Sequence, residues 1–192
     1  MPLEFELRTQ FGALAATKCP GSLKPSLRVF KPALGAVAHG LDAAILYRRL
    51  NIEAADRAIE QIRSVNMGTL IPAGRNAPLK LAEALQNGQH VAMLVDQYLT
   101  GGVEVTLFGR KTRANPMLAR LRRQIECPIH GVRIIRLPNH RFRAELSEEV
   151  PPVLDASGQI DIQGTTQAIT SVVEGWIREY PDQWLWLHRR WR

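Results

Sequence analysis

No hydrophobic run in this sequence is long enough to cross a bilayer. A membrane-spanning helix needs roughly 20 mostly apolar residues. The best candidate, ALGAVAHGLDAAIL at residues 33–46, is shorter and contains His39 and Asp42. The opening residues, MPLEFELRTQ, lack the basic start and apolar core of a secretory signal. We therefore expect neither a transmembrane segment nor a secretory signal in the sequence.

Cysteine is scarce, and this excludes a framework of disulfide bonds. Only Cys19 and Cys127 occur, a usage that fits a reducing compartment. No histidines and cysteines follow one another at metal-ligand spacing, so no structural zinc and no other metal is expected. The remaining composition, with 45% hydrophobic and 22% charged residues over 192 positions, is typical of one globular domain.

Acidic residues are nearly absent between Arg110 and Arg143. Ten basic residues stand there against a single acid, Glu126, an excess larger than the net charge of +7 of the whole chain. Such a field favours a polyanionic partner: nucleic acid, phosphorylated lipid, an anionic membrane surface or an acidic carrier protein. The alternative is a set of solvated surface arginines. Nucleic acid is not expected as a partner, because the stretch lacks interleaved stacking aromatics and any nucleic-acid-binding signature.

From about residue 34 onward, apolar runs alternate with helical patterns. Fully apolar strands that alternate with helices indicate an α/β protein with a mainly parallel sheet flanked by helices. The expected strands are AAILYR ending at Arg48, residues 90–95, VEVTLF at 103–108, and two strands around a turn at Pro138-Asn139. The expected helices cover residues 51–64, 77–86, about 116–125, and a last one with an apolar stripe at 169–180 that Pro181 ends.

Polar residues follow three of these strands. They are Tyr47-Arg48, Asp96-Gln97 and Phe108-Gly109-Arg110. In open α/β sheets the carboxyl ends of the strands face the ligand crevice. Arg48 and Arg110 have the chemistry to clamp a phosphate, and Asp96 to orient one of them. The alternative for each residue is a local hydrogen bond at a strand end.

Four segments in the same order resemble the lipid A biosynthesis acyltransferases of the late, lauroyl/myristoyl type. They are VAMLVDQ, GVEVTLFGR, the Asn-Pro helix start and the ending QWLWLHRRW. The resemblance extends from about Val29 to Arg192. We therefore interpret residues 29–192 as the C-terminal part of an acyltransferase domain and residues 1–28 as a divergent segment unlike the family.

The resemblance implies a glycerolipid-acyltransferase-like fold without its N-terminal elements. It implies transfer of a fatty acyl group from acyl carrier protein to a hydroxyl of a phosphorylated lipid A precursor. The expected location is the cytoplasmic face of the bacterial inner membrane, held peripherally, with no cofactor besides the acyl carrier protein co-substrate. Tyr47 and Arg48 match a block associated with head-group binding. A further block is matched by Asp96, Gln97, Phe108, Gly109 and Arg110.

The catalytic pair of the family is missing from its matching position. The family uses a histidine, four further residues, then Asp or Glu, and this pair belongs between Leu23 and Arg28, where the sequence reads LKPSLR. We therefore expect weak or no activity and interpret the chain as truncated or frame-disrupted. His39 and Asp42 lie only three apart, and we interpret the remaining histidines, His188 included, as structural or surface residues. The alternative function is a non-catalytic remnant that binds lipid or carrier protein.

The chain ends in YPDQWLWLHRRWR, which holds three of its four tryptophans. Tryptophan and arginine together suit a boundary between an apolar and an anionic medium, so this segment is a candidate for membrane and head-group contact. The alternative is that Trp184 and Trp186 cap the core and the arginines are solvated.

Overall fold

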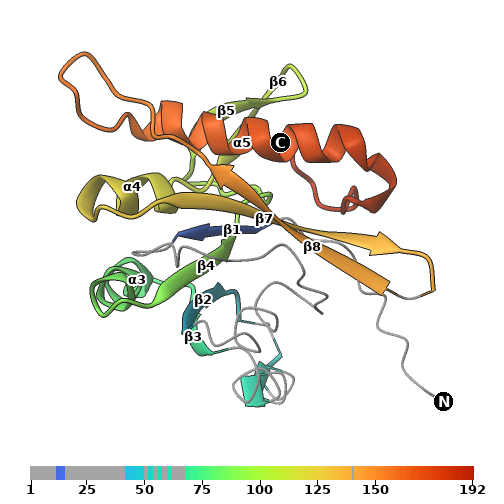
Figure 1. The fold of residues 1–192 in the computed structure, drawn as a ribbon, viewed down its shortest axis with the longest axis horizontal. Coiled ribbons are helices and arrows are strands. Elements are labelled where there is room, and N and C mark those ends of the chain that lie inside the picture. The colour runs from blue at the N-terminus through green and yellow to red at the C-terminus, as the bar shows by residue number, and fades with distance from the viewer. Residues whose placement is uncertain are drawn as a thin grey trace.

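The centre of the protein is a sheet of six strands with helices along one face (Figure 1). The computed structural model describes residues 12–15, 42–49, 52–53, 56–57, 60–61, 68–139 and 141–192. The strands of the sheet, in spatial order, are β3 (Thr69–Pro72), β2 (Ala43–Tyr47), β4 (His90–Leu94), β1 (Gly12–Ala15), β7 (Ile129–Leu137) and β8 (Arg141–Glu149).

The strand directions divide this sheet into two parts. Strand β2 is parallel to both of its neighbours, β3 and β4. The pairs β1–β4, β1–β7 and β7–β8 are antiparallel. The predicted α/β fold with flanking helices is confirmed. The sheet was expected to be mainly parallel, but it is mixed, and parallel pairing is confined to its β3–β2–β4 part. Strand β1 comes from the segment expected to be divergent, and it joins the two parts.

The long helices are α3 (Ala77–Gln86), α4 (Met117–Gln124) and α5 (Ile162–Glu179). Helix α3 packs on β2, β3 and β4, α4 contacts both α3 and α5, and α5 contacts β7. Helix α5 ends just before Pro181, as predicted, and a short 3₁₀ turn, η1 (Pro181–Gln183), follows it. The helix predicted over residues 51–64 lies mostly outside the described residues, although positions 53, 56–57 and 60–61 are helical.

Local signals in the sequence explain where α3 and α4 begin and end. Helix α3 has a proline in its first turn and ends at Asn87-Gly88, where Gly88 takes the left-handed conformation that favours glycine. Ahead of α4, the side-chain oxygen of Asn115 accepts a hydrogen bond from the Met117 amide at 3.0 Å. Both helices are confirmed close to their predicted bounds.

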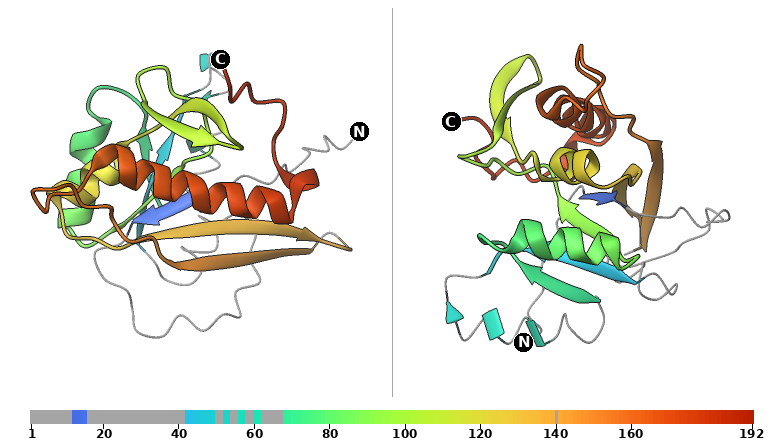
Figure 2. Two further views of the ribbon diagram at one scale, coloured as in Figure 1. Left: turned by 90° about the horizontal axis from the view of Figure 1, so that it is seen from above. Right: turned by 90° about the vertical axis from the view of Figure 1, so that its left-hand side faces the viewer.

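Strands β5 (Val103–Leu107) and β6 (Arg110–Ala114) form a separate antiparallel hairpin. We expected β5 to be a strand of the main sheet, and this was wrong. Its two-residue turn, Phe108-Gly109, has positive φ at both positions, which matches the right-handed twist of a hairpin. The hairpin packs on α5, which lies between it and the β7–β8 pair (Figure 2, left).

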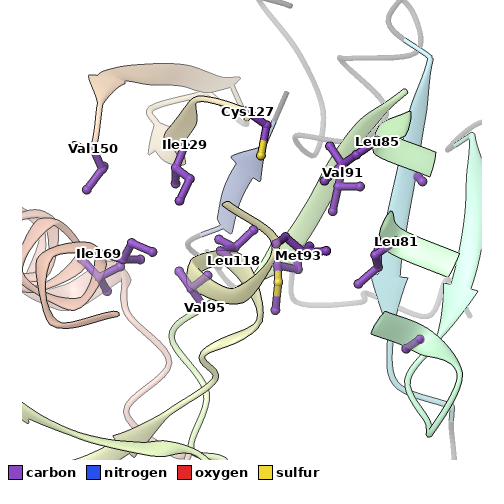
Figure 3. Packing of buried hydrophobic residues seen from close by; sticks show 14 of the residues in the cluster. Leu81, Leu85, Val91, Met93, Val95, Leu118, Cys127, Ile129, Val150 and Ile169 are labelled. Atoms are coloured by element: carbon purple, nitrogen blue, oxygen red, sulfur yellow. The ribbon is translucent and has the colours of Figure 1, made fainter. Parts of the chain in front are cut away.

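A hydrophobic core fills the space between the sheet and the helices (Figure 3). Leu81 and Leu85 of α3 meet Val91 and Met93 of β4, and the same cluster continues to Leu118 of α4 and on to α5. Complete burial of a side chain of this kind contributes about 1.5–3 kcal/mol. This core fixes the end of β4, where the polar residues of the candidate site begin.

Candidate functional site

The polar residues after β4 are held by the C-terminal segment of the chain. Asp96 is 8% exposed, and it accepts a hydrogen bond from the indole Nε1 of Trp184 at 3.3 Å. The main-chain oxygen of the next residue, Gln97, accepts one from the guanidinium of Arg190 at 3.0 Å. Residues 88 and 93 positions apart therefore meet at the carboxyl end of a buried strand.

Arg190 is the most deeply buried cation of the described residues, with 2% of its surface exposed. Besides Gln97, its guanidinium binds the main-chain oxygen of Arg113 at 2.6 Å, and its own carbonyl accepts a hydrogen bond from the Thr112 hydroxyl. Burial lowers the pKa of Arg190, while the nearby charge of Asp96 acts in the opposite direction. Charge-assisted hydrogen bonds of this kind are the strong ones. They tie β6 and the end of β4 to one side chain.

Aromatic rings fill the space beside this arginine. Phe108 stacks on Trp186 and is tilted against Trp191, with 6.3 Å between ring centroids in both pairs. Trp184 meets Trp186 edge to face at 4.7 Å and Trp191 at 6.3 Å. The guanidinium of Arg110 lies 5.4 Å from the Trp191 ring. We call these four aromatic residues, with Asp96, Arg110 and Arg190, the C-terminal cluster.

The structure thus brings together five of the seven predicted site residues. Asp96 and Gln97 reach the cluster from β4, and Phe108, Gly109 and Arg110 reach it from the hairpin turn. The φ angles of Phe108 and Gly109 are 52° and 71°. The Phe108 amide donates a hydrogen bond to the Glu174 carboxylate of α5 at 2.8 Å. The Arg178 guanidinium lies over the Phe108 ring, 5.0 Å from its centroid.

Tyr47 and Arg48 lie at the end of β2, apart from that cluster. The Tyr47 hydroxyl donates to Glu60 at 3.3 Å. Burial raises the pKa of Tyr47, and a hydrogen bond with Arg49 opposes this. Arg48 is exposed. Because β2 and β4 are parallel neighbours, both pairs of residues lie at the same edge of the sheet.

We expected one hollow lined by Arg48, Asp96 and Arg110. Two pockets among the described residues are lined by none of these three. One is a small apolar cavity between Val95 and Trp176. The other lies beyond β2 and β3 and is lined by Arg49, Arg75 and Lys80. The arginine whose charge acts on Asp96 is Arg190, a partner that the sequence did not suggest.

The described histidines make local contacts. Nε2 of His188 accepts a hydrogen bond from the Tyr98 amide at 2.9 Å, and the pKa of His188 is lowered by burial and by the charges of Arg190 and Arg192. Nδ1 of His130 lies 3.1 Å from the Ser147 carbonyl. Burial also lowers the pKa of His90. These contacts agree with the structural interpretation, whereas His39 and the stretch 23–28 lie outside the described residues.

Glu145 follows His140 at the spacing of the family's catalytic pair. The carboxylate of Glu145 is already engaged, by Arg133 at 2.6 Å and Arg143 at 2.7 Å. Glu145 belongs to β8. His140 itself lies outside the described residues. The spacing here accompanies a structural ion-pair network.

The C-terminal tryptophans have different roles. Trp184 is 5% exposed and belongs to the core, as one of the two readings of this segment predicts, whereas Trp186 is 53% exposed. The prediction of solvated arginines is wrong for Arg190. The sequence carries no signal for this exception, because Arg189, Arg190 and Arg192 occupy the same basic ending.

Two classes of feature are missing from the described part of the chain. No described helix has the length and apolar character needed to span a bilayer. Within the same residues, no three His, Cys, Asp or Glu side chains gather as a metal site would require.

The fold and the cluster define an α/β protein whose polar strand ends meet an aromatic and cationic C-terminal segment. A family model of the bacterial lipid A biosynthesis acyltransferases matches residues 34–192. The chain belongs to this family, and the resemblance noted in the sequence is confirmed. The comparison with curated proteins gives no match.

Proposed function

We propose that this chain recognises the substrates of lipid A acylation, a phosphorylated lipid A precursor and an acyl carrier protein thioester, and transfers the acyl group slowly or not at all. The carrying observation is the family match over residues 34–192, which includes all seven predicted site residues. It coexists with the absence of a histidine and of a carboxylate from residues 23–28.

The chemistry explains why that absence lowers the rate. A hydroxyl oxygen of the acceptor attacks the thioester carbonyl carbon, the carbon–sulfur bond breaks, and the carrier thiolate leaves and takes up a proton. The attacking hydroxyl must lose its own proton to a base. General base catalysis contributes typically about 10²–10⁴-fold, so a chain without the base retains at most a slow reaction.

An exposed apolar surface beside positive charge supports a membrane-facing role for the C-terminal segment. Trp186 is 53% and Leu187 is 76% exposed, and both lie between the core-forming Trp184 and the exposed Arg189 and Arg192. Such a surface suits the boundary between acyl chains and anionic head groups. We place it at the cytoplasmic face of the inner membrane, held peripherally.

The basic stretch supports an acidic carrier as the acyl donor. Arg120 and Arg123 are exposed on α4, and the stretch from Arg110 to Arg143 has only one acid. An opposing charge on the partner speeds encounter and fixes orientation. No cofactor is needed by this scheme beyond the acyl carrier protein thioester itself.

The test is an acyl-transfer assay on the purified chain, with acyl carrier protein thioester and lipid A precursor, followed by mass spectrometry of the lipid. An intact member of the family at equal concentration is the control. We expect product formation at least about 100-fold slower than the control, with binding of the precursor retained. Turnover equal to that of the control would refute the proposed loss of the base.

A non-catalytic remnant that binds lipid or carrier protein is the second candidate. The sequence LKPSLR at the expected catalytic position favours it. Co-sedimentation with anionic vesicles together with no detectable product would establish this candidate over a slow enzyme. Tight, salt-sensitive binding to DNA without any binding to lipid would contradict both candidates.

A further inference from the structure

A second polar site lies at the other parallel strand ends, outside the C-terminal cluster. It is a pocket of about 270 Å³ beyond β2 and β3, at the beginning of α3. Its charged lining consists of Arg49, Arg75 and Lys80, and Gly74 and Asn76 complete this side of the wall. None of these five residues belongs to the site predicted from the sequence.

The sheet itself positions these walls. Tyr47 of β2 pairs with Pro72 of β3 in parallel register, and the Ala73 amide donates to the Tyr47 carbonyl at 2.8 Å. Arg49 therefore leaves β2 beside the loop that leads from β3 into α3. Carboxyl ends of parallel strands followed by the beginning of a helix are the usual place for a ligand in an open α/β sheet.

The pocket gathers positive charge at the beginning of α3. Arg75 precedes α3, and Lys80 lies in its first turns, where the helix dipole is positive. The helix has no acidic residue in its first turn, and the Asn76 side chain does not cap it. Within the described residues, neither Arg75 nor Lys80 has an ion pair.

Two acids, Glu60 and Asp56, lie near the Tyr47 hydroxyl. Glu60 accepts a hydrogen bond from the Tyr47 hydroxyl, and that hydroxyl also interacts with Arg49. Among the residues that the structure describes, the lining of the pocket itself holds Arg49, Arg75 and Lys80 and no acid, so an excess of positive charge remains there.

We propose that this pocket binds a phosphate monoester. Arg49 and Arg75 have the planar donors that match phosphate oxygens in pairs, and Lys80 adds a point charge. A Cβ at Gly74 would meet no atom within 4 Å, so the wall is open there. An acyl chain would remove three cations from water without compensation, so the pocket does not suit one.

The source of the phosphate follows from the proposed function, on which this second step rests. An acceptor lipid carries its phosphate on a sugar at the membrane surface, and the pocket opens on the same sheet edge as Arg48 and Asp96. We assign the phosphate of the acceptor to Arg49, Arg75 and Lys80. Arg48 and Arg110, which the sequence suggested as the clamp, have no part in this pocket.

The experiment measures binding by the whole chain and by the variants Arg75→Ala and Lys80→Ala. Arg141→Ala is the matched control, because it removes one exposed charge from the far β7–β8 hairpin. One arm titrates inorganic phosphate, and the other uses vesicles with phosphatidic acid, a monoester, against vesicles with phosphatidylglycerol, a diester. Thermal unfolding of every variant shows that it is folded.

We expect each pocket variant to weaken phosphate-monoester binding by about tenfold or more, and the control variant to bind like the wild type. Loss in both arms identifies the phosphate group itself as the ligand. Loss in the vesicle arm alone identifies a lipid head group. Equal binding by the pocket variants and the control in both arms would overturn the proposal.

The two proposals fail in different ways. If the pocket variants bind inorganic phosphate more weakly than the wild type, but the wild type does not bind lipid A precursor, the phosphate site is supported and the proposed function fails. If the precursor binds equally to the wild type and to the pocket variants, the function stands and the pocket assignment fails.

Discussion

The Tyr98 amide donates a hydrogen bond to Nε2 of His188 at 2.9 Å. This bond joins the loop after β4 to the C-terminal segment, and it needs an imidazole that has a free lone pair at Nε2. Protonation of His188 would remove the acceptor. The contact between the loop after β4 and the C-terminal segment therefore depends on the neutral form of this histidine.

Stability should fall as the medium becomes acidic. Burial first, and then Arg190 and Arg192, lower the pKa of His188 below its ordinary value of about 6.5. The unfolded chain then binds the proton more tightly than the folded chain. The contribution of neutral His188 to the free energy of unfolding is therefore complete above pH of about 6.5 and is lost as the pH falls through the lower folded pKa. Urea unfolding of the wild type and of His188→Gln between pH 8 and pH 5 measures this pH-dependent contribution. A difference between the two that does not change with pH would contradict the assignment.

Arg190 should be far more important for stability than its neighbour Arg189. Replacement of Arg190 by alanine leaves the carbonyls of Gln97 and Arg113 and the charge of Asp96 without this partner. We expect a loss of about 3 kcal/mol or more in the free energy of unfolding. Arg189→Ala changes an exposed residue and should stay within about 0.5 kcal/mol of the wild type. Similar losses for both variants would refute the stabilising role of the buried Arg190 contacts.

Two glycines should respond to alanine in opposite directions. At Gly131 of β7 an added Cβ would collide with the Trp176 ring, so Gly131→Ala should destabilise the fold by about 1–3 kcal/mol. At Gly175 of α5 the Cβ would meet nothing, and alanine should stabilise the helix by about 0.5–1 kcal/mol. Chemical denaturation of both variants under one set of conditions checks this packing.

Lys80 should bind the phosphate at the cost of a lower free energy of unfolding. It lies near the positive end of α3, where an uncharged side chain removes an unfavourable interaction. Lys80→Gln should therefore raise the free energy of unfolding by about 0.3–1 kcal/mol at low salt. Lys111→Gln removes an exposed ion pair with Glu104 and should give no gain. Destabilisation by Lys80→Gln would show that the lysine stabilises the folded state.

The exposed Leu187 should contribute to membrane binding without a role in folding. Leu187→Ser should weaken co-sedimentation with anionic vesicles by roughly tenfold, since burial of a leucine in the interface contributes about 1.5–3 kcal/mol. Leu154→Ser is the control, because Leu154 is also exposed but lies in the loop before α5. Equal losses for both variants would place the membrane contact elsewhere.

Much of the fold follows from local signals. Asn115-Pro116 and Asn87-Gly88 act through the few residues that follow or precede them, so the bounds of α3 and α4 were predictable. The hairpin β5–β6 was not placed correctly. Its alternating pattern shows that one face is exposed, but the pattern is the same in a sheet edge and in a separate hairpin on a helix.

The site was predictable only in part. Polar residues after β4 and in the hairpin turn were expected to meet, and Asp96, Phe108 and Arg110 do so through the tryptophans. The burial of Arg190 was not predictable, because tertiary contacts alone distinguish it from the arginines beside it. Arg75 and Lys80 were also missed, although two cations around a proline-marked helix start are a usable signal for an anion.

The most direct test of the account is the affinity of the purified chain for one lipid A precursor before and after enzymatic removal of its phosphates. The central claim is that cationic strand ends recognise a phosphorylated acceptor even where acyl transfer is slow. The account predicts that the intact precursor binds at least about tenfold more tightly. Equal affinity for both forms, at equal salt and lipid concentration, would contradict it.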